Sequence, residues 1–279
     1  MPWISKTFKE QYLDSLGKTN AILKYTYENL LITKMGYTYS YNSLGSREQT
    51  YGKNAYTIRF NIETSGNVLR MATGMVHGKK NEEGQYTFCG IAFAQYVRGD
   101  FDYSKSFRID KNNSVAFHTA LGIAYPYGNS DQLPFEKRYF AGGANSVRAF
   151  NVRSIGPGSY HTNESRLSYL DQTGDLKLQA NLEYRPRLFG NLYGALFLDA
   201  GNVWALRDDG YRANSQLQMK NLLKETALGT GIGLRYDLEF FVLRIDRGFA
   251  LHLPYKTGFY NADSFHDAQC LHFAIGLPF

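Results

Sequence analysis

Strict two-residue alternation is the feature that most constrains how this chain can fold. Between residues 176 and 185, Leu176, Leu178, Ala180, Leu182 and Tyr184 alternate with Lys177, Gln179, Asn181, Glu183 and Arg185. Successive side chains of a β-strand point to opposite faces, so this stretch predicts a strand with one apolar and one polar face. Its length of about nine residues is that of a tilted strand that crosses a bilayer.

The same period recurs along most of the chain, with apolar and polar side chains alternating in each segment. We expect about nine strands. The clearest alternating segments are residues 37–41, 57–63, 115–125, 176–185, 192–201, 228–238, 241–246 and 271–279.

Alternation alone fits either a membrane barrel or a soluble β-sandwich, and the connections favour the barrel. Short connections at 187–191 and 238–241 contrast with long polar ones at 129–174, 205–223 and 254–268. Periplasmic turns and extracellular loops of outer-membrane barrels differ in this way. The sequence has no run of about 18 apolar residues, so it predicts no transmembrane helix.

Composition argues against several other classes of protein. The net charge is +6, but the basic residues are scattered among acidic ones, which does not favour nucleic-acid binding. Cys89 and Cys270 have no metal-type spacing, and the sequence does not reveal whether they pair. Acidic pairs at 100–102 and 208–209 could hold calcium weakly, although solvated loops explain them better. We find no catalytic motif and predict no enzyme, no metal and no cofactor.

The first part of the chain differs from the rest, because apolar residues recur there at three- and four-residue spacing between residues 6 and 31. We predict a helical connecting segment over residues 1–31 and a barrel region over 32–279. The start of the chain lacks the charged and apolar regions of a signal peptide. The chain is therefore expected to be mature or a fragment of a longer protein.

A long polar connection contains the least strand-like stretch, Phe135-Glu-Lys-Arg-Tyr-Phe-Ala-Gly-Gly-Ala-Asn-Ser-Val-Arg-Ala-Phe150. Two adjacent glycines permit a tight backbone path, and one arginine lies between hydrophobic neighbours. This stretch resembles the loop motif of the BamA/TamA superfamily of outer-membrane assembly proteins, the bacterial surface antigen family. The matching motif residues are Gly142, Gly143, Ser146, Val147, Arg148 and Phe150.

Other segments resemble the same family. Residues 175–202, 229–246 and 271–279 are similar to its final strands, with a terminal signal at Phe273, Ile275 and Phe279. Residues 155–160 are similar to the TamA-like branch of Bacteroidota. The resemblance implies an all-β, antiparallel transmembrane β-barrel of sixteen strands preceded by POTRA domains. It also implies that a loop of about 129–174 folds into the lumen, where Arg148 docks on Glu183 and Asp199.

Two departures from the family pattern affect what we expect. Ala149 stands where the family motif has glycine. Because alanine disfavours a positive φ, we expect an ordinary negative φ at this position. About nine strands match the C-terminal part of a sixteen-stranded barrel, or a smaller even-stranded barrel completed by another segment. Arg247 also lies on the apolar face of its strand, where it could extend to a membrane interface.

The resemblance implies a role in assembly, insertion or translocation of outer-membrane proteins in the bacterial outer membrane. Expected partners are membrane lipid, unfolded outer-membrane client proteins and accessory proteins. Two alternatives remain: a passive or structural barrel that acts as a small channel, and the membrane anchor of a larger secreted protein.

Overall fold

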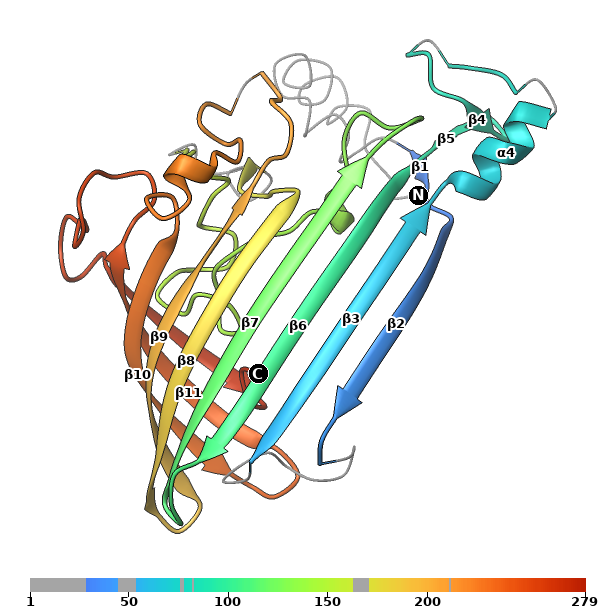
Figure 1. Ribbon diagram of the computed structural model, residues 1–279. Helices are drawn as coiled ribbons and strands as arrows, with labels where there is room; N and C mark the ends of the chain where they lie inside the picture. Colours follow the sequence, from blue (N-terminus) through green and yellow to red (C-terminus); the bar gives the residue numbers. More distant parts are fainter. Residues whose placement is uncertain (1–28, 45–53, 76–77, 82, 163–170, 211) are drawn as a thin grey trace, which may run out of the picture. The chain divides into compact units, whose positions relative to one another are not determined.

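Nine strands form one sheet in the computed structural model, which describes residues 29–44, 54–75, 78–81, 83–162, 171–210 and 212–279 (Figure 1). They are β2 (Lys34–Asn42), β3 (Ala55–Ser65), β6 (Tyr96–Arg108), β7 (Asn113–Pro126), β8 (Leu176–Phe189), β9 (Leu192–Trp204), β10 (Ala227–Asp237), β11 (Val242–His252) and β12 (Gln269–Ile275). The predicted antiparallel β architecture is confirmed.

The strands follow one another in the order β12-β11-β10-β9-β8-β7-β6-β3-β2, so neighbours in this sheet are consecutive along the chain. The register of β8 with β9 places Asn181 opposite Asp199 and Glu183 opposite Phe197. The polar positions of these two strands therefore share one face. Short turns join β6 to β7, β8 to β9 and β10 to β11.

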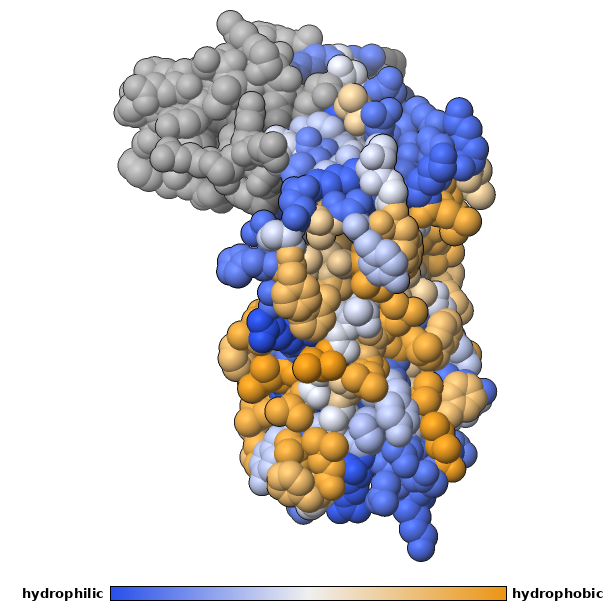
Figure 2. Space-filling model, turned by 90° about the vertical axis from the view of Figure 1, so that its left-hand side faces the viewer, coloured by the Kyte–Doolittle hydropathy of each residue, from blue (hydrophilic) through white to orange (hydrophobic). Residues whose placement is uncertain are grey.

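The sheet buries its polar side chains and exposes its apolar side chains, which is the reverse of the pattern in a soluble protein. On β8, Glu183 is fully buried while Leu182 is 46% exposed. On β10 and β11, Arg235 and Asp246 are buried while Ile232 is exposed. Figure 2 shows hydrophobic side chains in a broad belt on one face of the molecule, with hydrophilic ones beyond it. Lipid is the environment in which such an apolar outer surface is stable.

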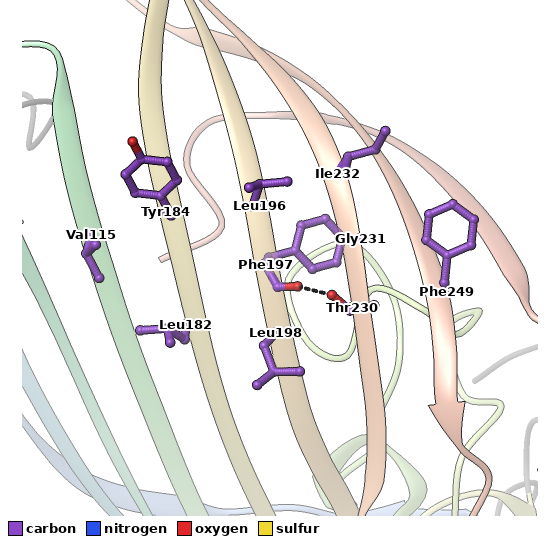
Figure 3. A pocket seen from close by; sticks show the side chains of 10 residues that line it. All are labelled: Val115, Leu182, Tyr184, Leu196, Phe197, Leu198, Thr230, Gly231, Ile232 and Phe249. Carbon is purple, nitrogen blue, oxygen red and sulfur yellow. Dashed lines mark hydrogen bonds between the residues drawn. The ribbon is translucent and has the colours of Figure 1, made fainter. Parts of the chain in front are cut away.

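A shallow depression in this outer surface has mostly apolar walls (Figure 3). Leu182, Leu196, Leu198 and Ile232 line it and belong to the exposed face of β8, β9 and β10. Gly231 also lines it, but a side chain at this position would meet the Phe197 ring and the Arg247 carbonyl. The depression is part of the lipid-facing surface.

The chain divides into two compact units. The first unit comprises Met1–Thr38, Asn61–Gly99 and Ile123–Arg138. The second unit comprises Tyr39–Phe60, Asp100–Gly122 and Tyr139–Phe279. The first contains helix α4 (Asn67–Met75) and a small sheet of β1 (Leu30–Leu31), β5 (Ile91–Phe93) and β4 (Thr87–Phe88). A buried Glu63 there accepts hydrogen bonds from Tyr96 and Lys137, each at 2.6 Å. The second unit contains the inserted loop described below. Short 3-10 turns lie at Phe135–Lys137 and Met219–Asn221.

Several features differ from what the sequence predicts, among them β6, which was not predicted. Residues 1–28 of the predicted helical segment lie outside the described residues, and Leu30–Leu31 form a strand that pairs with β5. Helix α4 was not predicted. The last strand ends at Ile275 rather than Phe279, because Gly276 takes a φ of +89° and Pro278 lacks a backbone N–H.

No helix in the described ranges is both long and apolar enough to span a membrane.

We predict that Leu182→Arg destabilises the folded protein in lipid by about 2–4 kcal/mol, because it places a charge at mid-strand on the lipid-facing side. Phe189→Arg, at the end of the same strand, should cost only about 0–1 kcal/mol. Urea titrations of folding into phospholipid vesicles would measure both. Equal effects of the two substitutions would contradict the lipid-facing assignment.

Candidate functional site: the loop arginine and its buried ion-pair network

The segment 139–155 folds back on itself before it crosses the polar face of the sheet. Tyr139 pairs with Gly174, and Ala141 pairs with Ile155, so both arms of the loop are fastened by backbone bridges. Gly142 and Gly143 have φ values of +91° and +94°.

Hydrogen bonds inside the loop require this unusual backbone path. The Gly143 N–H donates to the Phe150 carbonyl at 2.9 Å, and the Ser146 N–H donates to the Gly143 carbonyl at 3.0 Å. A side chain at Gly142 would meet the carbonyl of Asn151. Glycine is therefore required at position 142 by both conformation and space.

Arg148 lies at the tip of this fold and is fully buried. Its Nε and Nη2 donate to the two carboxylate oxygens of Asp199, each at 2.8 Å, in a fork geometry. Its backbone N–H donates to the same carboxylate at 3.0 Å, and its Nη1 donates to Glu183. The structure thus brings together the three residues that the sequence analysis linked.

The guanidinium of Arg148 also lies 3.7 Å from the ring centroid of Phe197, which neighbours Asp199 on the inner face of β9. Burial alone would lower the pKa of Arg148, but hydrogen bonds and charges from Asp199 and Glu183 outweigh it and raise that pKa above its ordinary value. The arginine therefore stays charged.

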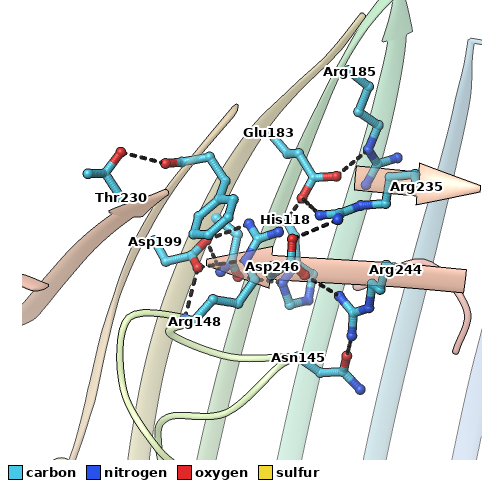
Figure 4. Close-up of polar contacts among 12 residues, drawn as sticks. His118, Asn145, Arg148, Glu183, Arg185, Asp199, Thr230, Arg235, Arg244 and Asp246 are labelled. Atoms are coloured by element: carbon cyan, nitrogen blue, oxygen red, sulfur yellow. Dashed lines mark hydrogen bonds and ion pairs between the residues drawn. The ribbon is translucent and has the colours of Figure 1, made fainter. Parts of the chain in front are cut away.

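Further charges extend the network across four strands (Figure 4). Glu183 pairs with Arg185 at 2.7 Å and with Arg235 at 3.2 Å. Arg235 pairs with Asp246 at 2.6 Å, and Asp246 pairs with Arg244 at 3.7 Å. Arg244 in turn donates to the side chain of Asn145 in the loop. The loop is thereby connected to β8, β9, β10 and β11.

Neutral side chains fix the carboxylates and the loop backbone. Asn181 donates to Asp199 at 2.7 Å and to the Ser146 carbonyl at 2.8 Å. The Ser146 hydroxyl donates to Gln179 at 2.9 Å. Because each of these groups is buried, removing one partner would leave the other without a hydrogen bond and without water, which is energetically costly.

Small residues allow the loop to approach the sheet. A side chain at Gly248 would meet the backbone of Arg148 and Ala149, and one at Gly229 would meet the Ala149 side chain. Ala149 does not have a positive φ, as its departure from the family pattern led us to expect.

The apolar residues on either side of Arg148 and Ala149 are buried. Val147 is fully buried close to Gly201. Phe150 is also buried.

The terminal residues divide between the two faces. Phe273 and Ile275 on β12 are 71% and 72% exposed, on the apolar face. Phe279 was expected on that face too, but its ring stacks on the His118 ring at 5.1 Å. His118 contacts Asp102 at 3.0 Å and Asn181 at 2.9 Å. The turn at Gly276 therefore carries Phe279 to the polar side.

Other residues singled out by the sequence have local roles. Cys89 is exposed and Cys270 is buried, and both are free thiols. Asp100 accepts from Tyr139, and Asp209 accepts from Arg212. Within the described ranges, no group of three or more His, Cys, Asp and Glu side chains is arranged to hold a metal. Arg247 is exposed and contacts Gln269 at 2.9 Å.

Sequence reasoning identified Arg148, Glu183 and Asp199 but missed the rest of the charge network. Arg185, Arg235, Arg244 and Asp246 all lie at polar positions of alternating strands. Charged residues at those positions were the available signal. Their pairing could not be deduced because it depends on the register between strands that are far apart in sequence.

An antiparallel sheet with an apolar outer face and an arginine loop bound to its polar face defines a membrane β-barrel with an inserted loop. Comparison with known families gives the more specific assignment. Residues 8–279 match the Omp85 superfamily domain, so the chain belongs to the Omp85 superfamily. The chain therefore forms a region of an antiparallel transmembrane β-barrel of the BamA/TamA type.

Individual relatives agree with this assignment. The outer membrane protein assembly factor BamA of Neisseria meningitidis is 28% identical over 115 residues, which cover 39% of this chain and 14% of BamA. The sorting and assembly machinery component 50 homolog of Xenopus tropicalis is 27% identical over 227 residues, covering 73% of this chain and 46% of the relative. The chain thus spans less than half the length of either relative.

Among solved structures, BamA from Haemophilus ducreyi lacking POTRA domains 1–3 superposes with a TM-score of 0.46 at 15% identity. The superposition covers 88% of this chain and 55% of that one.

We predict that Arg148→Ala destabilises the folded protein by about 3–5 kcal/mol, because it leaves Asp199 and Glu183 buried without their cation. Arg148→Lys should retain part of this stability, since lysine keeps the charge but cannot form the fork. The temperature at which heat-modifiable gel mobility is lost would measure the effect. Lys111→Ala, at an exposed turn position, is the control. An unchanged transition in Arg148→Ala would refute the docking role.

Proposed function

We propose that this chain takes part in assembly, insertion or translocation of outer-membrane proteins in the bacterial outer membrane. The superfamily assignment and the similarity to the outer membrane protein assembly factor BamA and to a sorting and assembly machinery component support this proposal. Unfolded outer-membrane proteins are the proposed clients, with membrane lipid and accessory proteins as further partners. Membership of the TamA-like branch of Bacteroidota stays a prediction.

The observation that carries the proposal is the edge presented by β12. In the described part of the chain, β12 is the last strand of its sheet and pairs only with β11. It has seven residues, whereas β10 and β11 have eleven each. An exposed strand edge offers unpaired backbone groups to another strand, and this is how β-augmentation captures extended segments.

The hydrogen-bond pattern identifies which groups face that edge. The Gly276 N–H donates to the Val242 carbonyl, and the Ala250 N–H donates to the Ala268 carbonyl. Because N–H directions alternate along a strand, residues 270, 272 and 274 also bond to β11. The N–H groups of Leu271, Phe273 and Ile275 therefore point to the outer edge, where a client strand would pair.

The inserted loop supports this mechanism by making the neighbouring strands rigid. Its ion pairs and those linked to it involve β8, β9, β10 and β11. The docked arginine thus stabilises β8 to β11, the strands that precede β12 in the sheet. A client strand would therefore pair with the edge of a rigid sheet. In this proposal the loop residues have a positioning role and carry out no chemical step.

We predict that Phe273→Pro slows client insertion, because proline removes an N–H from the outer edge without removing a bond to β11. Phe273→Ala is the matched control, since it removes the same side chain and keeps the N–H. A urea-unfolded outer-membrane barrel would be added to vesicles containing each variant, and its heat-resistant fraction followed over time. Equal insertion rates would refute the edge mechanism.

The same assay distinguishes the two alternative functions. A passive or structural channel would conduct ions across the vesicle membrane without accelerating client insertion. A membrane anchor of a larger secreted protein would do neither.

A further inference from the structure

Helix α4 has an exposed apolar face that the proposed assembly function does not explain. Val68, Met71 and Met75 are 60%, 65% and 76% exposed. Their spacing of three and four residues places them on one side of a helix. Thr73, on the opposite side, is 3% exposed. The helix is therefore amphipathic, with its polar side packed and its apolar side uncovered.

Hydrogen bonds at the first residue fix where α4 begins. The side chain of Asn67 accepts from Gln95 at 3.0 Å and from the Tyr127 hydroxyl at 2.8 Å. It also donates to the Thr64 hydroxyl at 2.8 Å. These partners lie at or next to the ends of β3, β6 and β7. The start of the helix is thus tied to the ends of three strands.

The packed side of the helix is fixed by an aromatic contact. The Arg70 guanidinium lies 4.0 Å from the centroid of the Tyr86 ring, and the Lys80 ammonium lies 4.8 Å from the same centroid. Gly78 packs against Thr73. These contacts hold one side of α4 against the connection that follows it, so the side with Met71 and Met75 stays turned outward.

Strand length places the beginning of α4 at the surface of the bilayer. β3 has eleven residues and ends at Ser65, with only Gly66 between it and α4. Figure 1 shows α4 directly after the end of β3. Eleven residues extend about 36 Å, which at a tilt of about 45° spans the roughly 25 Å apolar band of an outer-membrane barrel. The helix therefore begins where the hydrocarbon region ends.

The compact unit that contains α4 also exposes apolar side chains on its strands. In the same compact unit, Ile62 on β3 and Val97 on β6 are 43% and 37% exposed, and Ile123 on β7 is 46% exposed. Phe88 and Ile91 in the connection after the helix are also exposed. Exposed apolar side chains at the membrane boundary are covered at least cost by the bilayer itself.

We infer that α4 is an interfacial membrane helix, which places Val68, Met71 and Met75 at the boundary between headgroups and acyl chains. Helices of this kind lie in the plane of the membrane with their apolar face about 5–10 Å deep. α4 belongs to the connection that joins β3 to β6. The helix would thereby fix the strand ends at which it begins relative to the lipid surface.

Depth-dependent fluorescence quenching of the full chain in vesicles tests this inference. Cys89→Ser and Cys270→Ala remove the native thiols, and single cysteines then carry an NBD label at Met71, Leu182 or Lys79. Leu182 marks the lipid-facing side of β8, and the exposed Lys79 marks the polar connection after the helix. Phosphatidylcholine–phosphatidylglycerol vesicles carry a nitroxide either near the headgroup or deep in the acyl chains.

We expect the label at Met71 to emit at shorter wavelength than the label at Lys79 and to be quenched most by the shallow nitroxide. The label at Leu182 should be quenched most by the deep nitroxide. Water-like emission at Met71 with lipid quenching at Leu182 would overturn the inference but leave the membrane-spanning sheet intact. A blue shift at Met71 that requires added protein would overturn it in favour of a protein-docking surface. Both outcomes leave the edge mechanism of β12 untouched.

Discussion

The polar side of this sheet depends on one buried cation, Arg148. A guanidinium without solvent is stable only where carboxylates accept its hydrogen bonds, and the fork to Asp199 together with the contact to Glu183 meets that requirement. These acceptors belong to two adjacent strands. The position of the loop is therefore fixed by the register of β8 against β9. The loop in turn supplies a cation to Asp199, and it shares Glu183 with Arg185 and Arg235.

Backbone space is as necessary to this arrangement as charge. Gly142 and Gly143 allow the reversal that presents Arg148, while Gly229 and Gly248 leave the surface on which Ala149 rests. A methyl group at any of these four positions would meet neighbouring atoms. The motif and the sheet are thus matched by the absence of side chains at particular positions as well as by the pairing of particular charges.

The sequence predicted the strands best where one apolar and one polar face were uninterrupted, as in β8. It missed β6, where Gly99 and Lys105 break the apolar positions of an otherwise alternating segment. It also missed α4, because nine residues with two methionines and a glycine give a weak helical pattern. Arg148 and its two acceptors came from a family resemblance, whereas the links from Glu183 to Arg235 and Asp246 required the structure.

The sequence by itself determined which side chains face lipid and which face inward, because the two-residue period of a strand is a local property of the chain. It also determined that the arginine loop could turn back, since adjacent glycines permit that path wherever they occur. Only the tertiary structure decided which carboxylate meets which guanidinium, and that Phe279 stacks on His118. Those contacts join residues that are distant in sequence, so they depend on strand register and on the turn at Gly276, which alternation alone does not specify.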